Sequence, residues 1–178
     1  ISALTGQTID LHPANLPYYF ESNKTITIEG PATADVIIES TVTDQSMFVA
    51  HESSTVTIKN LTISGAQMVD RQTSGIVVSD ATLTLDNINL TGFYQRYQSN
   101  APITASGETT QVFITDSVIN DNKGGYYGGA IESSNLDILS IENSTFSNNQ
   151  CYSGRSGGAI YDAGSNITID GSTFISNT

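Results

Sequence analysis

Positive charge and cysteine are scarce in this sequence. Only 6 of its 178 residues are Lys or Arg, against 18 Asp and Glu, so the formal net charge is −12. Because nucleic acids and anionic membranes are bound through clustered Lys and Arg, this deficit disfavours both as partners. Cys151 is the one cysteine of the chain, which excludes an internal disulfide framework and a cysteine-based metal site.

Tryptophan, long apolar runs and helical periodicity are missing as well. No hydrophobic segment is long enough to span a membrane, so direct membrane insertion of this chain is not expected. No window carries apolar residues at the i, i+3, i+4, i+7 spacing of an amphipathic helix. The sequence therefore gives no support to an α-helical or membrane-spanning fold.

What the chain does contain is a repeat of 27 to 30 residues. An alternating apolar segment ends once in every repeat, a second apolar anchor follows in most of them, and a third apolar series runs in the same phase. A fixed period in this range is typical of an array of stacked units. The first series is Ile28, Ile58, Leu85, Ile114, Ile141 and Ile169; the second is Ile63, Leu90, Ile119, Phe146 and Phe174; the third is Phe20, Phe48, Ile76, Ile103, Ile131 and Ile160.

The residues of each repeat favour strands over helices. The periodic segments alternate apolar and polar residues, are rich in Ile, Val, Thr and Phe, and are bounded by Gly, Asn, Asp or Ser. Roughly three short strands per repeat, each burying one face, form one coil of a parallel β-helix, and parallel crossovers are right-handed. The sequence thus predicts an all-β, right-handed parallel β-helix of about six coils.

The two ends of the chain differ from its middle. Residues 1–24 break the repeat and contain Pro13 and Pro17, which cannot donate to a sheet ladder, so we expect an N-terminal cap and a first partial coil there. Residues 25–178 are expected to form the repeats. Thr178 falls in mid-coil, so the parent protein is expected to continue with further coils, and the open last coil is expected to promote self-association.

Two short motifs recur in the later repeats. In the Gly-Gly-Ala-Ile motif the glycines are predicted to permit a bend with unusual φ angles. In the Phe-x-x-Asn motif the ring is predicted to fill the interior, while the Asn amide bonds the backbone of the following bend and stacks on its equivalents. These structural positions are Gly128, Gly129 and Ile131, Gly157, Gly158 and Ile160, Phe146 and Asn149, and Phe174 and Asn177.

With these two motifs the sequence resembles the repeats of polymorphic membrane protein passengers. Similar repeats occur in other autotransporter adhesins and in adhesin-like surface proteins of gut microbes. The motifs cover residues 112–178, and weaker repeats extend back to residue 25. The resemblance implies secretion, display at the cell surface and adhesion, with a β-barrel or cell-wall anchor supplied by regions outside this chain.

Enzymes that cleave polysaccharides share the β-helix, so a lyase or hydrolase is the alternative. Such chemistry needs paired carboxylates, or carboxylates that hold a metal beside a cationic base. The acidic residues Asp116, Glu142 and Asp170 instead recur singly at equivalent or adjacent bend positions, where Asp is an ordinary turn residue. His12 and His51 lie far from the glycine-rich repeats. We therefore predict no catalysis, no cofactor and no metal.

The connection from the second strand of a coil to the third is the candidate binding surface. Its length varies, and insertions in repeat proteins map to loops on one face. Four of the 6 basic residues and five of the 8 tyrosines fall there. Tyr and Arg suit sugars or protein partners, so a host-cell glycan or receptor is the expected ligand; the alternatives are loop shielding and a purely structural, self-associating stalk. The candidate residues are Arg71, Tyr94, Arg96, Tyr97, Lys123, Tyr126, Tyr127, Tyr152 and Arg155.

Overall fold

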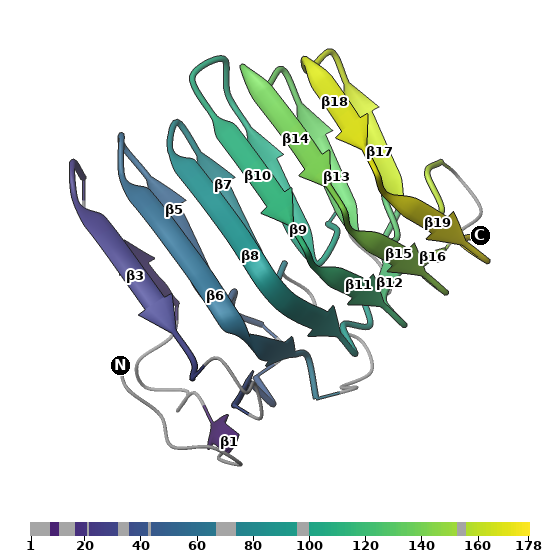
Figure 1. Cartoon of the computed structure of the whole chain (residues 1–178), viewed down its shortest axis with the longest axis horizontal. Helices are drawn as coiled ribbons and strands as arrows, with labels where there is room; N and C mark the ends of the chain where they lie inside the picture. Colours follow the sequence, from purple (N-terminus) through teal and green to yellow (C-terminus); the bar gives the residue numbers. More distant parts are fainter. Residues whose placement is uncertain are drawn as a thin grey trace.

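The computed structural model describes residues 8–10, 17–20, 22–31, 36–42, 44–66, 74–95, 100–152 and 156–178. Within these ranges the regular elements are all β-strands, which wind as a parallel β-helix, so the predicted fold class is confirmed (Figure 1). The strands are β1 (Thr8–Asp10), β2 (Tyr18–Phe20), β3 (Thr25–Glu29), β4 (Ile37–Glu39), β5 (Phe48–His51), β6 (Thr55–Ser64), β7 (Ile76–Ser79), β8 (Thr82–Thr91), β9 (Ile103–Ser106), β10 (Gln111–Thr115), β11 (Val118–Asn120), β12 (Lys123–Gly124), β13 (Ile131–Ser134), β14 (Ile138–Glu142), β15 (Thr145–Ser147), β16 (Gln150–Cys151), β17 (Ile160–Ala163), β18 (Ile167–Asp170) and β19 (Thr173–Ile175).

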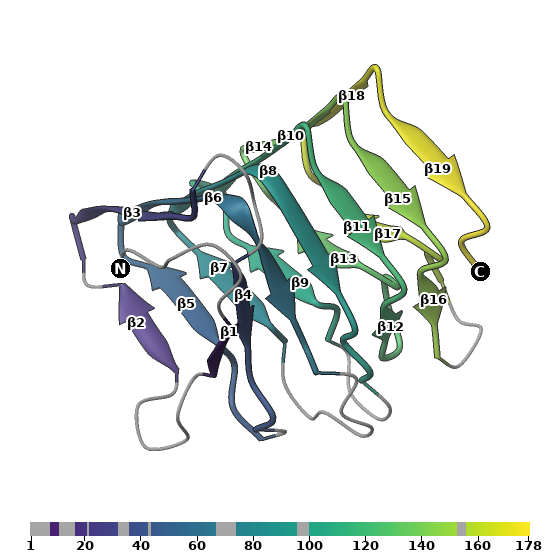
Figure 2. The ribbon, with the colours of Figure 1, turned by 60° about the horizontal axis from the view of Figure 1, so that its bottom comes forward.

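Successive coils stack strand upon strand, and the strands of the described ranges pair in parallel. One wall of the helix is the six-stranded sheet β2-β5-β7-β9-β13-β17. A second sheet has eleven strands, because β6 and β8 run on through a bend and belong to two walls (Figure 2). The short strands β12 and β16 pair in a third sheet. The six stacked strands of the first wall correspond to about five complete turns, slightly fewer than the predicted number of coils.

The first apolar series forms an inward ladder, as the spacing predicts. Ile58 pairs with both Ile28 and Leu85, and Ile114 pairs with Leu85 and Ile141. Burial alternates along β6, β8 and β10, with the ladder residues fully buried and their neighbours half-buried. The ladder forms because equal spacing returns the chain to the same side of the core in each coil, where one face of every strand is removed from water.

The third apolar series also stacks in register from Phe48 to Ile160, but its predicted first step is wrong. Phe48 pairs with Tyr18, and Phe20 pairs with Ala50. A shift of two residues keeps the same side chains pointing inward, so the alternation of apolar residues cannot detect it. The rings of Phe20 and Phe48 still stack, with centroids 5.9 Å apart and planes at 12°.

Residues with left-handed φ angles make the bend between the two walls of the eleven-stranded sheet. Asn60, Asn87, Asp116, Asn143 and Gly171 have φ of 56°, 50°, 48°, 49° and 56°. Asn, Asp and Gly tolerate this conformation better than other residues. The sequence places one of them after the first apolar segment of each of these coils, and this explains why a single bend recurs along the molecule.

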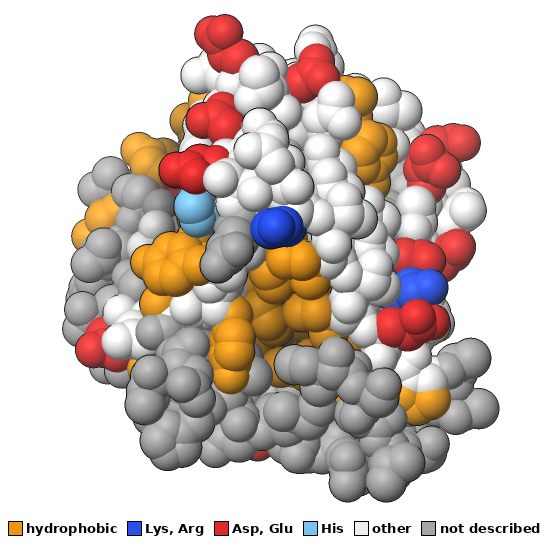
Figure 3. All heavy atoms as spheres, turned by 90° about the vertical axis from the view of Figure 1, so that its left-hand side faces the viewer, with side chains coloured by type: hydrophobic (Ala, Val, Ile, Leu, Met, Phe, Trp, Pro, Cys, Tyr) orange, Lys and Arg blue, Asp and Glu red, His pale blue; other side chains and the backbone are white. Residues whose placement is uncertain are grey.

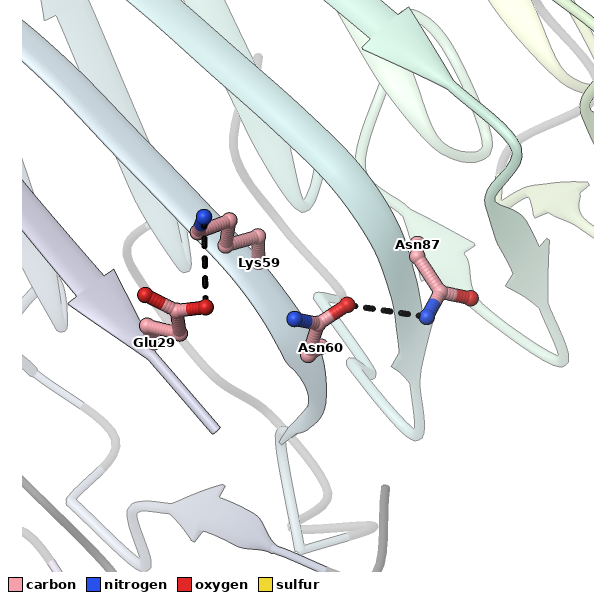
Figure 4. Close-up of polar contacts among 4 residues, drawn as sticks. All are labelled: Glu29, Lys59, Asn60 and Asn87. Carbon is pink, nitrogen blue, oxygen red and sulfur yellow. Dashed lines mark hydrogen bonds and ion pairs between the residues drawn. The ribbon is translucent and has the colours of Figure 1, made fainter. Parts of the chain in front are cut away.

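Polar side chains connect neighbouring coils at this bend (Figure 4). Asn87 Nδ2 donates a hydrogen bond to Asn60 Oδ1 at 3.0 Å. Lys59 Nζ lies 3.2 Å from Glu29 Oε1, in an exposed ion pair that contributes little to stability. The bends are therefore aligned from coil to coil by side chains as well as by the backbone ladder.

The asparagines of the Phe-x-x-Asn motif form a ladder of their own. Asn149 Nδ2 donates to Ile119 O at 2.8 Å and to Asn177 Oδ1 at 3.0 Å. Asn149 Oδ1 accepts from the backbone N and from Nδ2 of Asn122, at 3.3 and 3.0 Å. Asn122 and Asn149 are fully buried. Each amide thus satisfies backbone groups that a bend would otherwise leave unpaired inside the protein.

The two glycines of each Gly-Gly-Ala-Ile motif have different tasks. Gly128 and Gly157 adopt positive φ angles of 67° and 74°, as the bend requires. A Cβ atom on Gly129 would overlap Gly158 O, and one on Gly158 would lie 2.6 Å from Thr178 N. The first glycine therefore turns the chain, and the second allows the backbones of adjacent coils to approach.

Part of the segment 1–24 belongs to the ladders. β1 pairs in parallel with β4, and β2 with β5, so both strands extend the walls of the β-helix. Residues 1–7, 11–16 and 21 lie outside the described residues, and the predicted cap stays a prediction.

Candidate functional site

Five of the nine candidate binding residues lie within the described part of the chain: Tyr94, Lys123, Tyr126, Tyr127 and Tyr152. The other four fall outside it. These are Arg71, Arg96, Tyr97 and Arg155. We call the five described residues the tyrosine edge, since they follow the second strands of three successive coils, β8, β11 and β15.

Stacked coils bring the first part of the tyrosine edge together. Tyr94 forms a parallel bridge with Lys123, one coil further on. Lys123 Nζ lies 5.1 Å from the centroid of the Tyr94 ring, within the range of a cation–π contact. Lys123 is exposed and Tyr94 is half-buried, so the charge stands at the surface above an aromatic face.

The second part of the edge is held by the short strand β16. The backbone N of Tyr152 donates to Gly124 O at 2.9 Å and to Gly125 O at 3.0 Å. The thiol of Cys151 donates to Tyr126 O at 3.1 Å. Tyr152 is 42% exposed, whereas Tyr126 and Tyr127 are half-buried. The loop that carries Tyr126 and Tyr127 is thus fixed by backbone contacts to the next coil.

Phe93 directly precedes Tyr94 in the chain but does not belong to this surface. The structure places Phe93 in the core at 0% exposure, where its ring fills the space beside Gly75. Its backbone N donates to Asn122 Oδ1 at 3.1 Å. Phe93 follows the end of β8 at a point where its ring can reach the core, and removal of the ring from water lowers the free energy of the folded state.

The structure adds two residues that the sequence did not single out, Glu132 and Tyr161. They are register partners on the outer face of β13 and β17. The ring of Tyr127 packs on that of Tyr161, with centroids 4.6 Å apart and planes at 33°. Tyr127 therefore connects the tyrosine edge to this outer face. The alternation of residues along β13 could have predicted that Glu132 points outward. It could not have predicted that the side chain is partly buried.

Glu132 is an unusual carboxylate for the surface of a β-helix wall. Its Oε2 atom is buried and has no hydrogen-bond partner. Burial without compensation raises the pKa of Glu132 from 4.5 to about 7. The hydroxyl of Thr104, the ladder neighbour of Glu132, instead forms a hydrogen bond with Ser74 Oγ at 2.6 Å. Strongly perturbed carboxyl groups concentrate at functional sites, which makes Glu132 a candidate.

The family comparison agrees with this geometry. A family model described as the right handed beta helix region matches residues 46–178, which is 133 of the 178 residues. The chain belongs to this right-handed β-helix family. Searches of the curated proteins and of the solved structures gave no significant match. The β-helix family fixes the fold and leaves the function to be argued from the surface of this chain.

Several other acidic residues of the described ranges lie next to the bend within the eleven-stranded sheet. Lys59 pairs with Glu29 and Asp86, and Glu142 pairs with Asp170, so each occupies an equivalent ladder position. Asp162 differs, because it lies at the inward position next to Ser133. Its desolvation is outweighed by hydrogen bonds from Ser165, Ser133 and the Gly164 backbone, which lower its pKa.

Within the described ranges, no group of three or more His, Cys, Asp or Glu residues is placed to hold a metal ion. No helix in the same part of the chain is long and apolar enough to cross a membrane.

Replacing Glu132 with glutamine should make the β-helix more stable above pH 7 and change little at pH 5. A folded-state pKa of about 7 favours the protonated form, so the contribution of Glu132 to stability is complete below pH 4.5 and is lost as the pH rises through 7. Because the side chain is half-exposed, we expect a gain of only about 1 kcal/mol at pH 8.

The measurement is urea unfolding of both proteins at pH 5 and pH 8. Glu142→Gln is the matched control, since Glu142 is exposed on the neighbouring strand β14. Identical pH dependence of the wild type and Glu132→Gln would contradict the assigned pKa.

Proposed function

We propose that this β-helix is a non-catalytic binding module of an extracellular surface adhesin. The observation that carries the proposal is the tyrosine edge, in which Tyr94, Lys123 and Tyr152 come from three successive coils. The walls provide a rigid frame, and the loops between them carry the aromatic and basic side chains. Rigid scaffolds that present loop residues are a common arrangement for binding.

The chemistry of the edge suits recognition. Tyrosine offers a flat apolar ring with a hydroxyl group and loses little conformational entropy on binding. Lys123 places a positive charge on a protein whose net charge is −12. A local reversal of charge beside aromatic rings favours a ligand that combines a hydrophobic face with hydrogen-bonding groups. Glycans and protein loops both have this character.

Secretion and surface display follow from the same proposal. The Gly-Gly-Ala-Ile and Phe-x-x-Asn motifs resemble those of autotransporter passengers. In the last coils the glycines allow the backbones to approach, and the asparagines form the amide ladder. In such proteins a stacked β-helix holds binding surfaces away from the cell. The proposal therefore includes a location outside the cell, at the cell surface.

The test is to replace Tyr94, Tyr126 and Tyr152 together with alanine. Binding to target cells or to an immobilised glycan panel should weaken more than tenfold if each ring contributes about 1 kcal/mol. These side chains lie outside the inward ladders, so the circular dichroism spectrum should keep its β-sheet signature. Tyr19→Ala is the matched control, because Tyr19 is 62% exposed on β2, away from the edge. Equal adhesion of the triple variant and the wild type would reject the tyrosine edge as the binding surface.

A carbohydrate-active enzyme remains the second candidate, favoured by Glu132. A carboxyl group with a pKa of about 7 can act as a general acid near neutral pH. Its two ladder neighbours are Thr104 and Tyr161, so neither supplies the second carboxylate of a glycosidase pair. Polysaccharide cleavage, assayed with and without Ca²⁺, distinguishes this candidate: activity that Glu132→Gln abolishes would replace the adhesin proposal.

Self-association is the third candidate, favoured by the apolar end faces. Ile169 and Phe174, which continue inward ladders, are 48% and 41% exposed on β18 and β19. The opposite end also shows hydrophobic side chains gathered in its centre (Figure 3). Exposed strand edges of this kind pair readily with other chains. Sedimentation over a range of concentrations would detect end-to-end association, and a monomer throughout would reject it.

A further inference from the structure

We propose that Glu132, Tyr127 and Tyr161 form a subsite for an uncharged sugar ring on the outer face of β13 and β17. The inference rests on the proposed binding function and names the ligand class of that surface. Glu132 would accept hydrogen bonds from sugar hydroxyls, and the paired tyrosine rings would pack against the apolar face of the ring. Neither Glu132 nor Tyr161 belongs to the set that the sequence indicated.

The first argument is that folding does not explain why Glu132 has a buried carboxyl oxygen without a hydrogen-bond partner. A buried polar atom without a partner costs free energy, and most such atoms in native proteins have a partner. Glu132 Oε2 has none, and the ladder does not require a carboxylate: the equivalent outward position holds Thr104 one coil earlier and Tyr161 one coil later. A ligand donor would supply the missing hydrogen bond. The side chain is half-buried, so a change of its χ1 or χ2 rotamer would bring the carboxyl group to a ligand on the outer face.

The second argument is the shape of the aromatic pair. Tyr127 and Tyr161 lie 4.6 Å apart with planes at 33°, so their rings pack on each other. A cage for a methylated ammonium group needs rings that surround the cation, which this arrangement does not provide. Closely packed rings instead offer a combined aromatic surface, and sugars stack their C–H faces on such surfaces. The geometry therefore favours a sugar over a methylated ammonium group.

The third argument is charge. Glu132 carries partial negative charge at neutral pH, and the whole chain has a net charge of −12. Uronic acids, sulfated sugars and sialic acids would be repelled by both. Lys123 is the described cation of the tyrosine edge, and it already lies against the Tyr94 ring. An uncharged sugar with vicinal hydroxyls meets no such penalty.

The experiment uses the full chain at pH 7.5 and three probes: neutral oligosaccharides of gluco, galacto and manno configuration, oligosaccharides of uronic acids, and a lysine-rich peptide. Saturation-transfer NMR and calorimetry measure binding. For a neutral oligosaccharide, Tyr161→Ala should weaken binding at least about tenfold and Glu132→Gln about five- to tenfold. Tyr19→Ala should bind as the wild type does. Glu132→Gln preserves the volume of the side chain, so it keeps the test valid if Tyr161→Ala fails to fold.

Each outcome decides the matter. Loss of neutral-sugar binding in the Glu132 and Tyr161 variants, with retention in Tyr19→Ala, supports the subsite. Neutral-sugar binding that these two variants retain, but that the Tyr94, Tyr126 and Tyr152 triple variant loses, overturns the subsite and leaves the proposed function intact. Binding of the uronic-acid or peptide probe alone overturns the choice of ligand class. Absence of binding in every arm overturns the subsite, and if cell adhesion by the wild type is absent as well, the proposed function fails with it.

Discussion

Replacing Phe146 with alanine should lower the free energy of unfolding by about 3 to 5 kcal/mol. Phe146 is fully buried on β15 and lies in register with Ile119 and Phe174. Its ring stacks on that of Phe174, with centroids 4.9 Å apart and planes at 11°. The truncation removes apolar area from the core and leaves a cavity between coils that parallel strands on both sides prevent from closing.

Equilibrium unfolding in urea measures this loss. Phe113→Ala is the matched control, because Phe113 is half-buried at an outward position on β10. We expect its cost to be well below that of Phe146→Ala, since its removal opens no cavity between coils. An unfolding midpoint of Phe146→Ala equal to that of the wild type would show that the inward assignment of the Phe-x-x-Asn ring is wrong.

Replacing Asn149 with alanine should cost about 2 to 4 kcal/mol, because each buried backbone group that loses its partner costs about 1 to 2 kcal/mol. The substitution removes the acceptor of the Asn122 backbone N and the donor of Ile119 O. It also interrupts the amide ladder, since Asn149 bonds the side chains of Asn122 and Asn177.

The control for this variant is Asn120→Ala on the neighbouring strand β11. The side chain of Asn120 donates to Asp121 Oδ2 at 2.8 Å and holds no backbone group, so its loss should cost less than about 1 kcal/mol. Hydrogen exchange adds a local measurement: the amide of Asn122 should lose protection in Asn149→Ala alone. Equal stability of the two variants would show that the asparagine ladder is not a structural element of the bend.

The inward ladders were predictable because they depend on local rules. Alternation with a period of two places Ile58 and Ile63 on the inner faces of their walls, and equal spacing between coils puts Leu85 and Leu90 above them. The bends at Asn60 and similar residues follow from the tolerance of Asn, Asp and Gly for positive φ. The pairing of Phe20 with Ala50 could not be predicted in this way, because a register shift of two residues leaves the alternation of apolar and polar residues unchanged.

The candidate site was predictable only in part. Counting Tyr and Lys in the connections located Tyr94 and Lys123, which the structure brings into contact. The structure places the preceding residue, Phe93, in the core. The connections vary in length and have no period, so the sequence does not determine which of their side chains turn inward.

The sequence by itself determined the period of the coil, the residues that face the core and the residues that make the bend, because each depends on the chemistry of a single position or on its spacing from the next. Only the tertiary structure decided that Tyr127 packs on Tyr161 and that the carboxyl group of Glu132 is desolvated. The reason is physical: parallel stacking places residues from different coils side by side, and the solvation of a carboxylate depends on everything that surrounds it, whatever its place in the chain.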